Sequence, residues 1–396
     1  MDITIFPQKL QGCITLLPSK SQAHRLLICA AFADSPTELL CSQTNRDMEA
    51  TVDCLNALGA EIKRTDAGYF VTPVTEMPRK ALLNCCESGS TLRFMLPVAG
   101  ALGVDATFAM EGRLPQRPLS PLWEEMERMG CALSRPTATT TRCTGKLLPG
   151  HYRMDGSVSS QYITGLLLAL SLLDTPSELE ITGKIESKPY IQMTRDALRV
   201  FGPDPEHPGG KALRSPGSLT VEGDWSNGAF FLAANALGSH LDVLGLNPDS
   251  AQGDRASADL IPALVSGPQT IDASDIPDLV PVLSVVAACF HGCVFTNIQR
   301  LRLKESDRVA SVIAMIEALG GRAEADEATL RVFGTGLRGG TVDSVNDHRI
   351  AMSAAIAAIA CTEPVRILGA QCVQKSYPTF FEEYRRLGGN YEQYLR

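Results

Sequence analysis

The sequence lacks the features that mark membrane, secreted and nucleic-acid-binding proteins. Its apolar runs, such as residues 166–173, are far shorter than the roughly 20 residues of a membrane-spanning helix. The first residues have neither the basic start nor the apolar segment of a signal peptide. The net charge of −8 offers no excess of the positive charge that nucleic-acid binding requires. We therefore expect a cytoplasmic protein that binds neither membranes nor nucleic acid.

Motifs that hold metals are missing too, although the chain has 12 cysteines. No two cysteines have the Cys-x-x-Cys spacing, and the six histidines include no His-Glu-x-x-His motif. Small secreted disulfide proteins are short and dense in cysteine, whereas this chain has 396 residues. We expect reduced cysteines that pack as small apolar groups.

What the sequence does contain is a recurring α/β pattern. A helix-like stretch ends in an apolar residue and a glycine, and a strand-like segment usually follows. A glycine suits the left-handed backbone that closes a helix. Chance recurrence within an α/β protein is the alternative to true repetition. True repetition predicts six α/β units, arranged as two domains of three units each. The glycines that end the helices of these units are Gly59, Gly130, Gly202, Gly267 (a degenerate copy), Gly320 and Gly388. The proline-rich segment 203–216 is expected to be a loop.

In the first half of the chain, polar and basic residues gather just before apolar helices. Lys20 and Arg25 flank the start of one helix, and Arg113 and Arg117 lie on a proline-containing loop. A nucleotide P-loop is excluded at Lys20, because the upstream glycine of that motif is missing. Helix capping or solvated charge is the alternative for such segments, although a cap explains one serine of 157–162 and not the whole polar row. The segments are 17–25, 87–93, 112–119, 157–162 and 187–190.

The second half has its own polar segments at helix starts. Asp278 stands at the head of an apolar helix, where it either stabilises the helix dipole or takes part in catalysis. Charged residues at 303–308 and 346–349 precede further helices, and Lys375 precedes the last one. Helix N-termini attract anions through unpaired N–H groups and the helix dipole. If these helix starts face one cleft, they form a site for small, multiply anionic ligands such as phosphates and carboxylates.

These segments, in this order, resemble the 5-enolpyruvylshikimate-3-phosphate (EPSP) synthase family. The resemblance rests on Lys20-Ser21-x-x-x-Arg25, Ser159-Ser160-Gln161, Lys304-Glu305-Ser306-Asp307-Arg308, Asp347-His348-Arg349 and Lys375. It implies an α/β fold of two domains, each built from three similar units, with the active site between them. The expected domains are residues 1–18 with 223–396, and residues 19–222.

The resemblance also implies a reaction and its ligands. The enolpyruvyl group of phosphoenolpyruvate would move to the 5-hydroxyl of shikimate 3-phosphate, in the pathway to chorismate and the aromatic amino acids. We expect a monomer that needs no metal or organic cofactor. Shikimate 3-phosphate would be held by Lys20, Ser21, Arg25, Ser159, Ser160, Gln161, Ser187, Tyr190, Asp278 and Lys304. Phosphoenolpyruvate would contact Lys20, Gly89, Arg117, Gln161, Arg308, Arg349 and Lys375.

Catalysis in such a reaction needs two proton transfers. Asp278 is expected to act as base toward the hydroxyl, with Lys304 close enough to share its proton. A coupled pair shares its titration, so the sequence leaves open which of the two accepts the proton. Glu305 is the candidate that protonates C3 of the enol, and His348 is expected to assist. Lys20 would contact both substrates.

The chain departs from the family pattern at two positions. Glu87 stands where many members have Asn, and a carboxylate there repels phosphoenolpyruvate unless an arginine pairs with it. Arg300 stands where some members have an Asn that contacts shikimate 3-phosphate. Gly89 keeps room for the competitor glyphosate, so we expect inhibition of unpredicted strength.

Two other functions remain as alternatives. The related enolpyruvyl transferase that acts on UDP-N-acetylglucosamine typically has a reactive cysteine near the position of the 113–117 loop, which has none here. A non-catalytic anion-binding protein of the same fold would leave Asp278 and Glu305 without a task.

Overall fold

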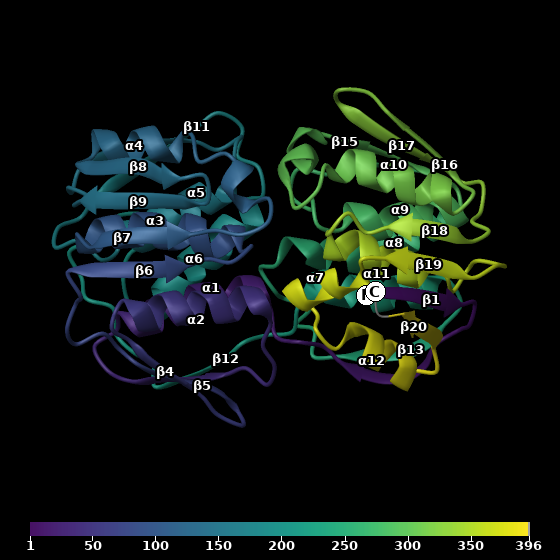
Figure 1. The fold of residues 1–396 in the computed structure, drawn as a ribbon, viewed down its shortest axis with the longest axis horizontal. Helices are drawn as coiled ribbons and strands as arrows, with labels where there is room; N and C mark the ends of the chain where they lie inside the picture. Colours follow the sequence, from purple (N-terminus) through teal and green to yellow (C-terminus); the bar gives the residue numbers. More distant parts are fainter. Residues whose placement is uncertain (395–396) are drawn as a thin grey trace. The chain divides into compact units, whose positions relative to one another are not determined.

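The computed structural model describes residues 1–394, which form two compact units (Figure 1). The continuous unit comprises Pro18–Glu222, and the discontinuous unit comprises Met1–Leu17 and Gly223–Arg396. Each unit has its own hydrophobic core. Among the described residues, no helix combines the length and the apolar character needed to cross a bilayer.

One repeating plan, β-α-β-α followed by a β-hairpin, builds both units. Its clearest copy is the sheet with strand order β6-β7-β9-β8. Strands β6 and β7 are parallel, and the β8–β9 hairpin adds to β7 in antiparallel fashion. The elements of this copy are β6 (Lys80–Asn84), α3 (Gly89–Leu102), β7 (Asp105–Ala109), α4 (Leu122–Arg128), β8 (Cys131–Thr137) and β9 (Thr140–Gly145).

The continuous unit contains two more copies. One forms the sheet β12-β3-β5-β4, and the other only the parallel pair β10-β11. Their elements are β12 (Ser218–Thr220), α1 (Lys20–Ala31), β3 (Thr37–Leu40), α2 (Arg46–Ala57), β4 (Glu61–Arg64) and β5 (Gly68–Thr72), then β10 (His151–Asp155), α5 (Ser160–Leu170), β11 (Glu178–Thr182) and α6 (Lys188–Val200).

The discontinuous unit repeats the arrangement with sheets β14-β15-β17-β16, β18-β19-β1-β20 and β13-β2. The first contains β14 (Gln269–Asp272), α9 (Val280–Cys289), β15 (Cys293–Thr296), α10 (Arg308–Ala318), β16 (Arg322–Ala325) and β17 (Thr329–Phe333). The second contains β18 (Gly340–Asp343), α11 (His348–Ala357), β19 (Val365–Leu368), α12 (Phe380–Arg386), β20 (Asn390–Tyr394) and β1 (Asp2–Phe6). The third contains β2 (Gln11–Thr15), α7 (Trp225–Ala236), β13 (His240–Leu244) and α8 (Ser257–Ser266).

The six α/β units predicted from the glycine repeat are therefore present, with one correction. Five of the six glycines have a left-handed φ between +83° and +108°. Gly267 is extended instead, with φ 175°, because Pro268 follows and disfavours helical or left-handed backbone at the preceding residue. The proline-rich segment 203–216 contains no helix or strand, as expected, and lies where other copies have a hairpin.

The repeating plan places helix N-termini together within each unit. In the continuous unit, α3 packs against both α5 and α2, and α1 packs against α2 and α6. In the discontinuous unit, α9 packs against α7 and α11. Because parallel strands end at the same sheet edge, the helices that follow them start at that edge. Most segments singled out in the sequence lie at these helix starts, whereas residues 112–119 and Lys375 lie in loops with 3₁₀ turns that precede α4 and α12.

Candidate active site

Serine side chains cap three helices of the continuous unit. Ser19 accepts a hydrogen bond from the Gln22 amide at the start of α1, and Ser88 accepts one from Thr91 at α3. Ser159 accepts one from the Gln161 amide at α5. Ser160 follows as the first residue of α5 and is buried. Capping thus accounts for Ser159, while the structure assigns no such task to Ser160.

Lys20 begins helix α1 and pairs with a carboxylate. Its Nζ lies 2.9 Å from Asp47 Oδ2, and the two side chains are 15% and 16% exposed. Asp47 lies in the first turn of α2, where its charge complements the helix dipole. Lys20 is therefore held at the helix start and still reached by solvent. Ser21, the next residue, is half-buried.

Arg25 is fully buried and bonded on all its nitrogens. Nε donates to Thr194 Oγ1 at 2.8 Å, and Nη2 donates to the Tyr190 carbonyl at 2.9 Å. Nη1 donates to the Ser21 carbonyl. Burial lowers the pKa of Arg25 to about 10, so the group is charged at neutral pH. It ties α1 to α6, and this structural task stands beside its predicted contact with shikimate 3-phosphate.

The amide of Gln161 is held in one orientation by two side chains that sequence reasoning did not assign. Arg93 Nη1 donates to Gln161 Oε1 at 2.6 Å, and Gln161 Nε2 donates to Ser90 Oγ at 2.9 Å. Arg93 also donates to the Pro118 carbonyl, at 3.2 Å, which anchors the loop after Arg117. Arg93 stood within the singled-out segment 87–93, but its position inside a helix gave no sign of these partners.

Gly89, at the start of α3, and the loop carrying Arg117 approach each other closely. A Cβ at Gly89 would lie 2.5 Å from Arg117 Nη1, so the guanidinium rests against the glycine. Arg117 Nε is buried, and no group within residues 1–394 accepts its hydrogen. At Gly112, a Cβ would lie 2.6 Å from Glu87 Oε2. Glu87 therefore points to the 112–117 loop.

Two further residues of this unit that were expected to bind shikimate 3-phosphate lie at the start of α6. Ser187 is buried and holds a left-handed backbone, with φ +54°, at the helix N-terminus. Tyr190 lies in the first turn, and its carbonyl accepts hydrogen bonds from Arg25 and Thr194.

In the discontinuous unit, Asp278 is surrounded by cations. Arg308 Nη1 donates to Asp278 Oδ1, and Lys304 Nζ lies 3.6 Å from the same oxygen. Arg349 Nη2 lies 3.8 Å from Asp278 Oδ2. The Asp278 side chain is 21% exposed, so this cluster of opposite charges can be reached by a ligand.

Arg308 bridges three carboxylates. Besides Asp278, it donates from Nη2 to Glu305 Oε2 at 2.7 Å and from Nε to Asp347 Oδ2 at 3.0 Å. Asp347 also accepts from the Ser306 hydroxyl at 2.9 Å and caps α11 through the Arg349 amide. The buried charge of Arg308 is thus compensated on each nitrogen. Sequence reasoning gave Asp347 no role, although it stood inside a quoted motif.

The pKa values of Asp278 and Lys304 are both lowered, but for different reasons. Burial raises the pKa of Asp278, but Lys304, Arg308 and Arg349 outweigh burial and hold it well below its ordinary value. Burial is also the largest effect on Lys304, and it lowers the pKa of the amine to about 8 against the attraction of Asp278. The charges of Arg308 and Arg300 lower it further. At neutral pH Asp278 is a stable carboxylate, and Lys304 can give up its proton.

The remaining predicted residues of this unit lie at the start of α11 and just before α12. His348 and Arg349 are buried in the first turn of α11. Arg349 Nη1 donates to the Ser226 carbonyl at 3.1 Å. Lys375 is buried at the end of a 3₁₀ turn and donates to the Asn346 carbonyl at 2.8 Å.

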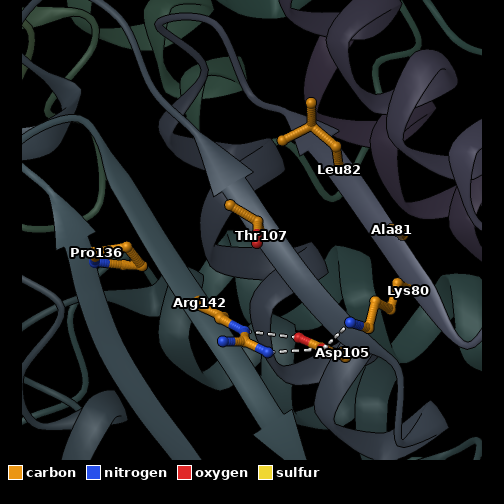
Figure 2. A pocket seen from close by; sticks show the side chains of 7 residues that line it. All are labelled: Lys80, Ala81, Leu82, Asp105, Thr107, Pro136 and Arg142. Atoms are coloured by element: carbon orange, nitrogen blue, oxygen red, sulfur yellow. Dashed lines mark hydrogen bonds and ion pairs between the residues drawn. The ribbon is translucent and has the colours of Figure 1, made fainter.

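An open hollow elsewhere on the continuous unit is not part of either cluster. It lies over strands β6, β7, β8 and β9 (Figure 2). Its charges neutralise one another, because Arg142 makes two 2.8 Å hydrogen bonds to Asp105 and Lys80 lies 3.9 Å from the same carboxylate. None of the predicted site residues lines it.

Comparison with known proteins identifies the family of the chain. The sequence model of EPSP synthase (3-phosphoshikimate 1-carboxyvinyltransferase) matches residues 6–384. The 3-phosphoshikimate 1-carboxyvinyltransferases of Clostridium kluyveri and Clostridium novyi are each 37% identical to the chain. The alignment with the Clostridium kluyveri protein covers 99% of this chain and 98% of that protein. The alignment with the Clostridium novyi protein covers 98% of each.

Solved structures show the same fold. EPSP synthase from Acinetobacter baumannii matches with a TM-score of 0.80 at 22% identity, over 99% of this chain and 100% of that one. The enolpyruvyl transferase NikO from Streptomyces tendae matches with a TM-score of 0.75 at 17% identity, over 99% and 98%. These likenesses confirm the predicted two-domain α/β fold class of the enolpyruvyl transferases.

The predicted family and enzyme class are confirmed by the match over nearly the whole chain and by relatives at 34–37% identity. The chain belongs to the EPSP synthase family and is an enzyme of the 3-phosphoshikimate 1-carboxyvinyltransferase class.

Proposed function

We propose that the two side-chain clusters carry out the reaction of this enzyme class, each unit supplying part of the machinery. The enolpyruvyl group of phosphoenolpyruvate moves to the 5-hydroxyl of shikimate 3-phosphate, and phosphate is released. The observation that carries the proposal is the grouping of Asp278 with Lys304, Arg308 and Arg349. Such a grouping combines proton-transfer groups with cations for anionic substrates.

The resemblance to the family assigns the binding residues, and their chemistry suits the two ligands. Lys20 and Gln161 contact both substrates, and Arg25 supports the shikimate side. The carboxylate and phosphate of phosphoenolpyruvate suit planar guanidinium groups, which bind such anions through paired hydrogen bonds. Phosphoenolpyruvate is bound by Gly89, Arg117, Arg308, Arg349 and Lys375, and shikimate 3-phosphate by Ser21, Ser159, Ser160, Ser187, Tyr190, Asp278 and Lys304.

We assign Lys304 as the base that accepts the proton of the 5-hydroxyl. A carboxylate whose pKa is held far below its ordinary value is a weak base, and this describes Asp278. An amine with a pKa of about 8 is matched to proton transfer near neutral pH. Neutral Lys304 accepts the hydrogen bond of the 5-hydroxyl and removes its proton, and the carboxylate of Asp278, 3.6 Å from Nζ, stabilises the ammonium group that forms.

The hydroxyl oxygen attacks C2 of the enol as C3 gains a proton, which gives a tetrahedral intermediate. Glu305 delivers that proton and recovers it when phosphate leaves. Its Oε2 accepts a 2.7 Å hydrogen bond from Arg308, which fixes the carboxyl in place. His348, which is buried at the start of α11, assists Glu305 in this proton transfer. Arginine and lysine side chains offset the negative charge of the two substrates and of the departing phosphate.

The test is release of inorganic phosphate by the purified protein with phosphoenolpyruvate and shikimate 3-phosphate. UDP-N-acetylglucosamine replaces shikimate 3-phosphate in a parallel reaction. We expect release with shikimate 3-phosphate alone, and loss of turnover in Asp278→Ala with an unchanged circular dichroism spectrum. Phosphate release only with the sugar nucleotide, or binding of phosphoenolpyruvate without turnover, contradicts the proposal.

We further propose that the enzyme works as a monomer in the cytoplasm, with the two compact units as its domains. All 12 cysteines are thiols, and most are buried. This state suits a reducing compartment. Gel filtration with light scattering tests the monomer.

A further inference from the structure

Asp254 is a buried carboxyl group that the mechanism above does not use. It lies in a 3₁₀ turn, Gly253–Ala256, just before α8, and is 1% exposed. The Ser226 hydroxyl donates to its Oδ2. Its Oδ1 is buried, and no group in the described part of the chain donates to it. A buried carboxylate oxygen without a donor is costly, whereas a protonated carboxyl group reduces that cost.

Ser226 connects Asp254 to the site. Its hydroxyl bonds Asp254, and its carbonyl accepts the 3.1 Å hydrogen bond from Arg349 Nη1. The other end of the same guanidinium lies 3.8 Å from Asp278 Oδ2. Arg349 is therefore contacted on one side by the residue that binds Asp254 and on the other by Asp278.

The charges around Asp254 come from three further elements. Asp224 caps α7, Asp278 precedes α9, and Arg349 lies in α11. Burial, Asp278 and Asp224 raise the pKa of Asp254, while Arg349 and the Ser226 hydroxyl lower it, and the result is about 7. The carboxyl group is thus divided between its two protonation states at neutral pH.

We infer that Asp254 is a positioning residue for Arg349: as a carboxylate it attracts the guanidinium across Ser226, and as a neutral acid it leaves Arg349 available to the phosphoenolpyruvate anion. The inference rests on the proposed function, since it takes Arg349 as a ligand of that substrate. Phosphoenolpyruvate binding to Arg349 then favours uptake of a proton by Asp254.

Linkage gives the pH dependence its sign. A bound anion adds negative charge near Asp254 and draws on the cation that stabilises the carboxylate, so the bound state holds Asp254 protonated to higher pH. By reciprocity, deprotonation of Asp254 weakens binding of the anion by the same factor. Each unit of pKa difference between free and bound protein corresponds to tenfold in affinity.

The kinetic test compares wild type, Asp254→Asn and the control Asp249→Asn, an exposed carboxyl on the same loop. Asparagine keeps the shape and stays neutral. From pH 6.5 to 8.5, the KM for phosphoenolpyruvate is expected to rise about sixfold more in wild type and the control than in Asp254→Asn. The kcat profiles should remain parallel. Ionisation of phosphoenolpyruvate changes the KM of every protein equally, so it cancels when the KM of a variant is divided by the KM of wild type. Parallel KM profiles for wild type and Asp254→Asn overturn the inference.

Ser226→Ala provides a second variant if Asp254→Asn does not fold. Removing the hydroxyl removes a hydrogen bond that lowers the Asp254 pKa, so the rise in KM should begin at higher pH. A rise at the wild-type pH contradicts the inference.

Infrared spectroscopy tests the titration without turnover. The carbonyl band of a protonated carboxylic acid should disappear near pH 7 in wild type and be absent in Asp254→Asn. Addition of phosphoenolpyruvate alone should move this transition upward by about one pH unit. If the protein releases no phosphate but the band shifts as expected, the proposed reaction fails and the Asp254–anion linkage stands. A band that does not respond to phosphoenolpyruvate overturns the linkage.

Discussion

Replacement of Asp278 by Asn should shift the pH dependence of catalysis if Lys304 accepts the hydroxyl proton. The attraction of Asp278 raises the pKa of Lys304, and burial together with Arg308 and Arg300 lowers it. In Asp278→Asn the lowering effects remain, and only the weaker attraction of Glu305 still opposes them. The pKa of Lys304 should therefore fall from about 8.

The distance between the charges sets the size of the shift. Lys304 Nζ and Asp278 Oδ1 are 3.6 Å apart. At an effective dielectric constant of about 20, Coulomb's law gives about 4.6 kcal/mol for such a pair, or about three pKa units as an upper limit. Both side chains are 21% exposed, so solvent screens part of this attraction. We expect a fall of about one to two units.

The assay is kcat/KM for shikimate 3-phosphate as a function of pH, because this parameter reports ionisations of the free enzyme. In wild type, activity should rise through a break near pH 8, as Lys304 loses its proton. The residual activity of Asp278→Asn should rise at a lower pH. Asp242→Asn, an exposed carboxyl on β13, should keep the wild-type profile. An unmoved break in Asp278→Asn, or a wild-type break below pH 5, refutes Lys304 as the acceptor.

Three further predictions concern binding and the departures from the family pattern. Gly89→Ala places a methyl 2.5 Å from Arg117 Nη1, so the guanidinium must move; inhibition curves should show weaker glyphosate inhibition, and equal potency rejects this steric argument. Arg117→Ala should raise the KM for phosphoenolpyruvate alone, and a matching rise for shikimate 3-phosphate contradicts that role. Arg300→Asn removes a charge that lowers the Lys304 pKa; the kcat/KM break should move to higher pH, opposite to Asp278→Asn.

The fold could be predicted because its signals are local. A glycine is favoured where the backbone turns left-handed after a helix, so Gly59, Gly130 and Gly202 mark unit ends in the sequence itself. The exception has an equally local cause, since Pro268 forces Gly267 into an extended backbone. These rules act over a few residues, and they hold in a single sequence without alignment.

The site was predictable only in part, because motifs name residues but not their partners. Arg308 was expected to bind phosphoenolpyruvate, yet each of its nitrogens already holds a carboxylate. Arg93 orients Gln161 from a helix that precedes it by more than 60 residues, a contact that only the tertiary fold creates. The hydrogen-bond partners of a site residue therefore come from segments that lie far away in the sequence, and motifs do not identify them.

The choice between Lys304 and Asp278 shows the same limit at the level of chemistry. A carboxylate is the ordinary base in a sequence motif, since its pKa near 4 leaves it ionised at neutral pH. Three cations drawn from a 3₁₀ turn and two helix starts make this carboxylate too acidic for that work. Burial, aided by the charges of Arg308 and Arg300, brings the pKa of Lys304 to about 8, where its amine can take a proton. Proton-transfer roles therefore follow from the folded cluster, and a base assigned from residue type alone should be tested against its neighbours' charges.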